Sequence, residues 1–111
     1  MILIGMYDSP FVRRAAVTLH HYGLAFDRRP ISVFRDFADV QAVNPLGRLP
    51  ALMLDDGTVI ADSTYILDHL DELAGPACAL TPPGGPARLE VQRCVAVALG
   101  LMEKSVESPH G

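Results

Sequence analysis

The order of short apolar runs and helical stretches is the feature that most restricts how this chain can fold. An apolar run over 2–6 predicts a buried strand that ends in a turn. Apolar residues then recur at helical spacing from Phe11 to Tyr22, and Gly23 ends the helix that they predict. A second strand, expected over 26–32, follows this helix directly and is therefore expected to run parallel to the first. The chain thus begins as a strand, a helix and a strand.

The rest of this first unit is predicted to be a short helix, two antiparallel strands and a further helix. These elements are expected over 35–43, 51–54, 58–60 and 62–75. The short helix ends before Pro45, since a residue that precedes proline disfavours helical geometry. The pair Asp56-Gly57 between the two strands favours a tight hairpin turn. The expected fold class is α/β, with four mixed strands in one sheet and three helices in βαβ-ββα order.

A segment rich in glycine and proline divides the chain. Residues 76–86 are expected to be a linker, because this composition is usual between packed units. Beyond it, residues 87–105 predict one long helix whose apolar side chains are spread around most of its circumference. A helix of this kind is buried on more than one side, and a small sheet domain covers only one. We therefore expect the sequence to be a fragment of a longer protein or an obligate oligomer.

Composition and charge exclude several classes of protein. Nine Lys and Arg stand against thirteen Asp and Glu, and the net charge of -4 does not favour binding of nucleic acid. No apolar run approaches the roughly 18 residues that cross a bilayer, and the amino terminus lacks the pattern of a signal peptide. A cytoplasmic protein without membrane contact is expected. Cys78 and Cys94 have no metal-ligand spacing, and His20 and His21 diverge on a helix, so we expect free thiols and no metal.

The stretch Ser9-Pro10-Phe11-Val12 occupies the loop before the first helix. The predicted element order is that of the thioredoxin architecture, in which this loop presents the reactive group. Redox proteins of that architecture carry two cysteines there, whereas this chain has Ser9 and Val12, so no mixed disulfide forms at this point. A hydroxyl remains at a helix start, where free N–H groups and the helix dipole favour an anion such as a thiolate. The alternative is an ordinary serine cap followed by proline.

Two further segments resemble sequences of the glutathione transferase family. Asn44-Pro45-Leu46-Gly47-Arg48-Leu49-Pro50 resembles the family signature Asn-Pro-x-Gly-x-Val-Pro, and Ala61-Asp62-Ser63 resembles its acidic helix start. The segment that begins at Ser9 is most similar to bacterial serine-type members, which begin Ser-Pro-Phe-Val-Arg. The three segments have the order and spacing of the family, and the resemblance covers residues 1 to about 105.

The resemblance implies a role for each residue of these segments. Ser9 is the catalytic residue that stabilises the thiolate of bound glutathione. Pro50 follows a cis peptide that turns the backbone of Leu49 outward to pair with the cysteinyl part, so leucine in place of the usual valine changes little. Asp62, shorter than the commoner glutamate, pairs with the γ-glutamyl ammonium, and Ser63 donates to the γ-glutamyl carboxylate. The alternatives are a proline that starts a strand and an aspartate that caps a helix.

Basic and aromatic side chains near these segments complete the implied site. Arg48 is the side chain that would meet the glycyl carboxylate, with Arg35 as a second candidate. Phe11 would lie near the thiol, and Arg13 and Arg14 would add positive charge close to it. For each of these residues a packing role or a solvated surface position is the alternative.

The function that the resemblance implies is thiol activation followed by group transfer. Glutathione is the co-substrate, no metal takes part, and the thiolate attacks a small, largely apolar electrophile. The glutathione-binding domain is expected over 1–75. Residues 87–111 are expected to contain the first helix of an all-helical domain, which builds most of the acceptor pocket in this family. A homodimer is expected. Two alternatives stay open, namely a non-catalytic binding or regulatory module of the same fold and a glutathione-dependent reductase or dehalogenase.

Overall fold

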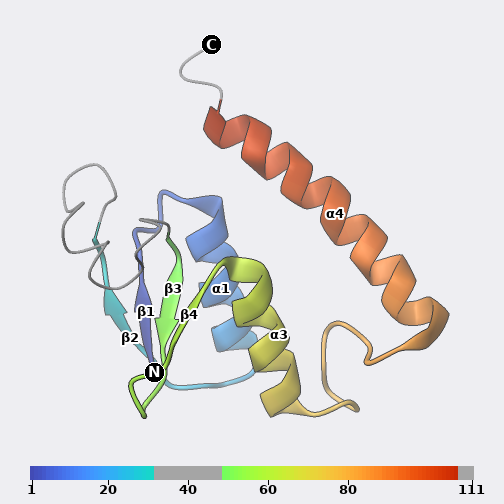
Figure 1. The fold of residues 1–111 in the computed structure, drawn as a ribbon, viewed down its shortest axis with the longest axis horizontal. Helices are drawn as coiled ribbons and strands as arrows, with labels where there is room; N and C mark the ends of the chain where they lie inside the picture. The colour runs from blue at the N-terminus through green and yellow to red at the C-terminus, as the bar shows by residue number, and fades with distance from the viewer. Residues whose placement is uncertain (32–48, 108–111) are drawn as a thin grey trace. The chain divides into compact units, whose positions relative to one another are not determined.

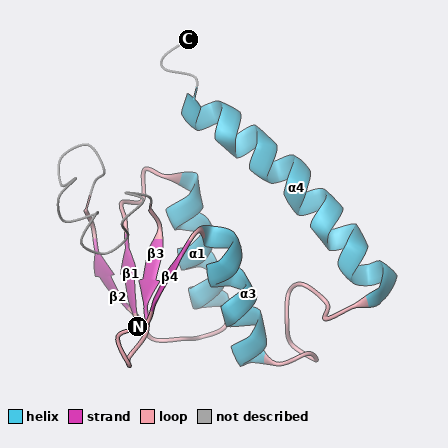
Figure 2. Cartoon of the chain, in the orientation of Figure 1, coloured by secondary structure: helices cyan, strands magenta, loops and turns pink. Residues whose placement is uncertain are grey.

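The computed structural model describes residues 1–31 and 49–107, with side chains up to residue 104 (Figure 1). Its strands are β1 (Ile2–Ile4), β2 (Asp27–Arg29), β3 (Ala51–Met53) and β4 (Val59–Ala61), and its helices are α1 (Pro10–His21), α3 (Ser63–Ala74) and α4 (Gly85–Glu107), which Figure 2 separates by colour. The strands form one sheet in the order β2-β1-β3-β4. Strand β1 runs parallel to β2 and antiparallel to β3, which is antiparallel to β4. The expected α/β fold with a thioredoxin-like mixed sheet is confirmed, and the helix predicted over 35–43 lies outside the described residues.

Two strands are shorter than the apolar runs that predicted them. Strand β1 ends at Ile4 because Gly5, with a φ of +138°, turns the backbone out of the extended conformation. Strand β2 ends at Arg29, since Pro30 has no N–H group with which to continue the ladder. All three residues of β2 are exposed, as befits the edge of the sheet. The predicted bounds 2–6 and 26–32 are therefore wrong at their ends.

The hydrophobic core lies on one face of the sheet, against α1 and α3. Leu3 of β1 is paired with Leu52 of β3, so both side chains point to the same face. The buried apolar residues that the helices add to this cluster are Val12, Ala15, Ala16 and Leu19 from α1 and Ile66 and Leu70 from α3. Burial of one large apolar side chain contributes about 1.5–3 kcal/mol. The core therefore fixes the starts of both helices relative to one sheet.

Gly5 allows α1 to begin close against the end of β1. A Cβ atom at this position would lie 2.6 Å from Cγ2 of Val12, which is in the first turn of the helix. Its positive φ is also a conformation that side-chain-bearing residues rarely adopt. Glycine at this position thus brings the loop that carries Ser9 next to the sheet.

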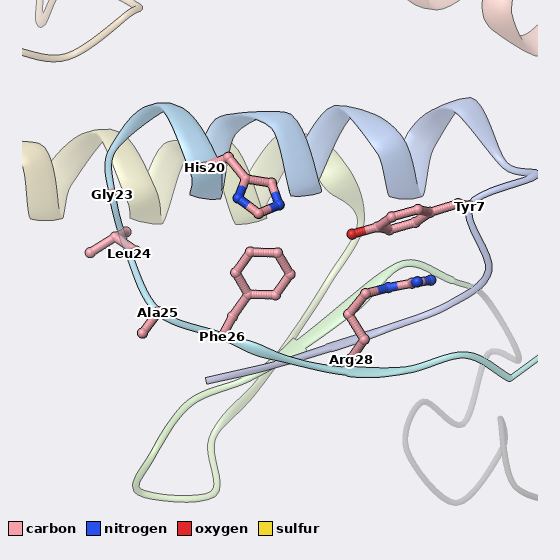
Figure 3. A pocket seen from close by; sticks show the side chains of 7 residues that line it. All are labelled: Tyr7, His20, Gly23, Leu24, Ala25, Phe26 and Arg28. Atoms are coloured by element: carbon pink, nitrogen blue, oxygen red, sulfur yellow. The ribbon is translucent and has the colours of Figure 1, made fainter.

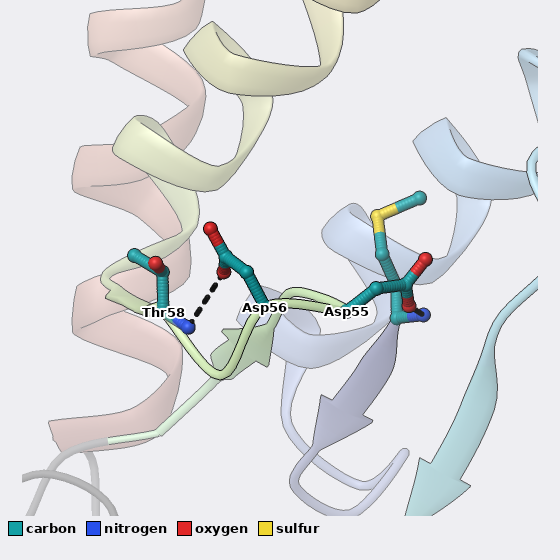
Figure 4. A network of polar contacts seen from close by, with 4 residues as sticks. Asp55, Asp56 and Thr58 are labelled. Carbon is teal, nitrogen blue, oxygen red and sulfur yellow. Dashed lines mark hydrogen bonds and ion pairs between the residues drawn. The ribbon is translucent and has the colours of Figure 1, made fainter.

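The hairpin between β3 and β4 is closed by polar contacts (Figure 4). Asp56 accepts a hydrogen bond of 2.9 Å from the N–H group of Thr58, and this bond lowers the pKa of the Asp56 carboxyl. Gly57 takes a φ of +89° in the same turn. The amino-terminal ammonium of Met1 lies 2.6 Å from the carboxylate of Asp55 and so ties β1 to the hairpin. The tight turn predicted at Asp56-Gly57 is confirmed.

The chain divides into two compact units, Met1–Leu70 and Asp71–Gly111. Among the described residues, no helix combines the length and the apolar character that a membrane span requires. The linker over 76–86 and the domain bounds placed on either side of it stay predictions.

Helix α4 is slightly longer at both ends than the helix predicted over 87–105. The expectation that it is buried on more than one side, in a longer protein or an oligomer, stays a prediction. Leu89, Val97 and Leu101 are 58%, 67% and 66% exposed. At 3.6 residues per turn these three side chains lie within about 120° of one another, so they share one exposed apolar face of the helix.

Candidate functional site

The loop after β1 places Ser9 at the start of α1. Ser9 is the residue before the first helical position, with extended backbone angles of φ -81° and ψ 127°. Its carbonyl accepts the first helical hydrogen bond from the N–H group of Arg13 at 3.1 Å. Its side chain is half-buried, and the hydroxyl makes no capping hydrogen bond to the helix. The alternative role of an ordinary side-chain cap is therefore not met, and the hydroxyl is not used by α1.

Two backbone donors accompany this hydroxyl. Pro10, at the first helical position, has no N–H group. The first hydrogen bond of the helix is donated by the N–H group of Arg13 to the Ser9 carbonyl. The N–H groups of Phe11 and Val12 have no hydrogen-bond partner within the described parts of the chain. The first turn contains no acidic residue that would neutralise the positive end of the helix dipole. The start of α1 thus has the chemistry of an anion-binding site.

The turn at Leu49 and Pro50 brings a second predicted segment to this loop. The Leu49–Pro50 peptide bond is cis, as the family resemblance implied. Cβ of Leu49 lies 3.7 Å from the position that a Cβ atom would take on Gly5, so the turn neighbours the end of β1. Pro50 is buried, and its carbonyl accepts a hydrogen bond of 3.3 Å from the N–H group of Asp62. The turn therefore also contacts the third predicted segment.

Asp62 starts α3 in an unusual backbone conformation. Its φ is +74°, in the left-handed region that aspartate tolerates better than most side-chain-bearing residues. Its carboxylate accepts a hydrogen bond of 2.9 Å from the N–H group of Thr64, and its carbonyl accepts one of 3.1 Å from that of Ile66. The alternative role of helix capping is thus present. Asp62 is exposed, and a carboxylate has more acceptor positions than this one bond uses.

Arg14 joins α1 to the start of α3. Its Nη1 atom donates hydrogen bonds to the hydroxyl of Ser63 at 3.0 Å and to that of Thr64 at 3.3 Å. Partial burial lowers the pKa of the Arg14 guanidinium, while the carboxylates of Asp62 and Asp68 act in the opposite direction. Arginine remains a cation in proteins in spite of such a change. The two helix starts are therefore connected through a charged, half-buried side chain.

The contact with Arg14 decides what the hydroxyl of Ser63 can do. Ser63 is only 3% exposed, and its oxygen accepts from the guanidinium, so its own hydrogen is left for another acceptor. The N–H group of Ser63 has no partner among residues 1–31 and 49–107. Ser63 thus carries two donors at a helix start, which is an arrangement that suits a carboxylate.

Sequence reasoning missed the structural role of Arg14, which it treated as one of two arginines that add positive charge. The helical spacing of Arg14 could have indicated this role. Arg14 precedes the buried Thr18 by four residues and so shares its face, and the Thr18 hydroxyl donates a hydrogen bond of 2.9 Å to the Arg14 carbonyl. Arg13 lies on the exposed side of the same helix.

Of the other predicted site residues, the described part of the chain includes Phe11 but not the two arginines. Phe11 is half-buried in the first turn of α1. Arg48, and its alternative Arg35, lie outside the described residues. Within the described ranges, no three His, Cys, Asp or Glu side chains gather closely enough to hold a metal ion. Cys78 and Cys94 are exposed free thiols.

Comparison with known proteins relates these segments to one family. Residues 3–82 match the model of the family described as glutathione S-transferase, N-terminal domain. Over 108 residues the chain is 32% identical to the uncharacterized GST-like protein YibF of Escherichia coli K12. That alignment covers 97% of this chain and 53% of YibF.

Solved structures show the same fold. A glutathione transferase family member from Pseudomonas fluorescens Pf-5, solved with bound glutathione, is similar at 38% identity and a TM-score of 0.81, over 95% of this chain and 53% of that one. A glutathione S-transferase from Methylobacillus flagellatus KT with glutathione bound is similar at 30% identity and a TM-score of 0.84, over 95% and 52%. The chain therefore spans about half the length of the relatives that it matches.

Proposed function

Because the chain belongs to the glutathione S-transferase family, we propose that it binds glutathione across the starts of α1 and α3 and holds the sulfur as a thiolate beside Ser9. The observation that carries this proposal is the hydroxyl of Ser9, which is uncapped and lies at a helix start with two unpartnered N–H groups among the described residues. A thiolate is the kind of anion that such donors stabilise.

The step that we assign to Ser9 is the stabilisation of sulfur after its proton leaves for solvent. A free thiol has a pKa of about 8.5, and lowering it by two units requires about 2.7 kcal/mol of extra stabilisation of the anion. A charge-assisted hydrogen bond from the hydroxyl, together with the helix end, contributes on the order of 2–3 kcal/mol. Ser9 keeps its own proton throughout, so no basic side chain has to act on it.

The remaining site residues hold the tripeptide in this proposal. Asp62 pairs with the γ-glutamyl ammonium, and Ser63 donates its N–H and hydroxyl hydrogens to the γ-glutamyl carboxylate. The backbone of Leu49, ahead of Pro50, pairs with the cysteinyl part as an added strand would. Arg48 meets the glycyl carboxylate. Phe11 lies beside the thiol.

The transfer step completes the proposed reaction. The thiolate attacks an electrophilic atom of a small apolar substrate and forms the new bond to sulfur, and the leaving group departs with the electron pair of the bond that breaks. The relatives are about twice as long as this chain. We therefore assign the acceptor pocket to an all-helical region that includes α4, in a cytoplasmic homodimer.

Calorimetric titration of the chain tests the binding half of this proposal. Glutathione is expected to bind at least about tenfold more tightly than cysteinylglycine, which lacks the γ-glutamyl group and so loses at least one charge-assisted contact. Asp62→Asn should remove most of this difference. Asparagine can still accept from the N–H group of Thr64 and also tolerates a positive φ, so the cap of α3 is retained.

The matched control is Asp56→Asn, which makes the same change at the hairpin. It should leave the preference for glutathione intact. Equal affinity for the tripeptide and the dipeptide, or equal effects of the two variants, would remove Asp62 from the site. An absence of glutathione binding would favour a non-catalytic module of the same fold.

A further inference from the structure

The Ser9 loop, residues 5–9, is held near both ends by backbone hydrogen bonds. At its start, the N–H group of Gly5 donates to the carbonyl of Arg29 at 3.0 Å. At its end, the N–H group of Ser9 donates to the carbonyl of Met6 at 3.2 Å. Tyr7 and the residue after it are exposed, and their backbone groups make no hydrogen bond within the described parts of the chain. Backbone hydrogen bonds therefore do not fix the middle of this loop.

The side chain of Tyr7 joins the middle of the Ser9 loop to the edge strand β2. Figure 3 shows the Tyr7 ring stacked against the guanidinium of Arg28, which extends from β2. The guanidinium carbon lies 3.3 Å from the centroid of the ring. A cation over an aromatic face is attracted by the electrons of the ring. Within residues 1–31 and 49–107, no carboxylate forms an ion pair with Arg28, so the Tyr7 ring is the partner that orients the guanidinium.

The direction of the Ser9 hydroxyl depends on this loop. The hydroxyl makes no capping hydrogen bond, so α1 does not orient it. Ser9 lies just before the first helical position, and Tyr7 lies two residues ahead of it in the chain. A catalytic group that is displaced by about 1 Å loses much of its effect on a reaction. The stack of Tyr7 and Arg28 is thus placed to decide where the hydroxyl points.

We propose that Arg28 and Tyr7 are positioning residues for the thiol activation assigned to Ser9. Neither side chain touches the sulfur. Their stack holds the Ser9 loop in the conformation in which the Ser9 hydroxyl donates to the thiolate. The inference rests on the proposed function, and it adds a requirement outside the three segments that resemble the family, because Arg28 belongs to β2.

The pKa of the thiol of bound glutathione, followed by ultraviolet absorbance of the complex, tests this inference. Arg28→Met should raise this pKa by about 0.5–1 unit, because the hydroxyl of Ser9 is then less well placed to stabilise the anion. The affinity for glutathione at about pH 5, where the thiol is protonated, should change by less than about twofold. An effect on the thiol pKa without an equal effect on affinity separates positioning of Ser9 from a general loss of structure.

The matched control is Arg29→Met. It removes the same charge from the neighbouring position of β2, where the side chain lies on the other face because side chains alternate along a strand. This variant should shift the thiol pKa by less than about 0.2 unit.

Substitutions at Tyr7 separate the stack from hydrogen bonding by the phenol. Tyr7→Phe keeps the ring and should keep the thiol pKa within about 0.2 unit of that in the unaltered chain. Tyr7→Leu removes the ring and should raise the thiol pKa as much as Arg28→Met does. In a Ser9→Ala background, Arg28→Met should cause no further shift, because its effect passes through Ser9.

Three results would overturn the inference. They are equal shifts in Arg28→Met and Arg29→Met, a further shift on Arg28→Met in the Ser9→Ala background, and a shift in Tyr7→Phe as large as in Tyr7→Leu. The last result would make the Tyr7 hydroxyl a direct donor to the sulfur. If Ser9→Ala alone left the thiol pKa unchanged, the proposed function would fail together with this inference. Should Arg28→Met fail to fold, the comparison of Tyr7→Phe with Tyr7→Leu decides.

Discussion

Helices α1 and α3 pack on the same face of the sheet, yet they begin in opposite ways. At the start of α1, Ser9 leaves its hydroxyl uncapped and the next residue is a proline without an N–H group. At the start of α3, Asp62 caps the N–H group of Thr64 at 2.9 Å, and Arg14 holds the hydroxyls of the first turn. The first start has no cap from its own side chain, whereas the second is capped and cross-linked by the protein's own groups and keeps only the donors of Ser63 for a ligand.

This difference separates two uses of the same residue types. Serine and aspartate are both favoured before a helix because their oxygens accept from free N–H groups. Asp62 does so and thereby stabilises the fold, whereas Ser9 does not. A side chain that occupies a capping position without capping has its hydrogen-bonding capacity left for something else. The comparison therefore assigns stability chiefly to the start of α3 and chemistry to the start of α1.

The largest expected difference is in the free energy of unfolding when alanine replaces the residue at the start of each helix. Asp62→Ala should lower the free energy of unfolding by about 2 kcal/mol, since it removes the cap and places alanine at a φ of +74°. Ser9→Ala should lower it by less than about 0.5 kcal/mol, because no capping bond is lost. Urea unfolding measures both.

Asp62→Gly serves as the control for the first variant. Glycine at a positive φ carries no steric cost, so this change should destabilise less than alanine does. If Ser9→Ala destabilised the chain as much as Asp62→Ala, the contrast between an uncapped and a capped helix start would be lost.

Arg14→Met is the next largest expected effect. It removes two hydrogen bonds at the start of α3 while it keeps the aliphatic stem, and should cost about 1–2 kcal/mol of the free energy of unfolding. Since Ser63 then loses the donor that orients it, the affinity for glutathione should also fall about five- to tenfold. Calorimetry and urea unfolding measure the two effects.

Arg13→Met is the matched control, because Arg13 lies on the exposed side of the same helix. It should leave both quantities nearly unchanged. Similar losses in the two variants would mean that Arg14 acts through general positive charge and not through its contacts with Ser63 and Thr64.

The smallest expected effect is that of Asp56→Asn on the pH dependence of stability. This variant also tests whether a capping carboxylate outside the site affects ligand binding. Its carboxylate accepts from the N–H group two residues ahead at 2.9 Å, as that of Asp62 does, but in a hairpin. Its pKa is lowered in the fold, so its contribution is present above the unfolded pKa and is lost as the pH falls through the folded value. Asp56→Asn should therefore make stability slightly less sensitive to acid below about pH 4.

Unfolding curves at several pH values measure this effect. Glutathione affinity should not respond to the same change. A greater sensitivity to acid in Asp56→Asn than in the unaltered chain would contradict the expected direction.

Most of the fold followed from local sequence patterns because periodicity and turn residues act over short distances. The tight turn at Asp56-Gly57 and the helix that begins at Ser63 are examples. Strand ends were less accurate, since Gly5 and Pro30 limit the pairing of β1 and β2 in ways that apolar runs do not show. The burial of α4 on more than one side stays a prediction, because it depends on surfaces that local patterns do not describe.

The candidate site followed from the sequence only in part. The order of three segments predicted which loops matter, and the bond between the Pro50 carbonyl and the Asp62 N–H group joins two of them. The contact between Arg14 and Ser63 was missed because the two residues are 49 positions apart, and no local pattern relates them. Whether the Ser9 hydroxyl caps its helix also depends on rotamer choice, which residue type alone does not decide.

The ionisation of bound glutathione tests the role of Ser9 most directly. Ultraviolet absorbance of the thiolate, followed against pH in the complex, gives the pKa of the bound thiol in the unaltered chain and in Ser9→Ala. We predict a thiol pKa about one to two units higher in the variant, with a much smaller change in glutathione affinity. Identical titration midpoints in the two proteins would contradict the stabilisation of the thiolate by Ser9.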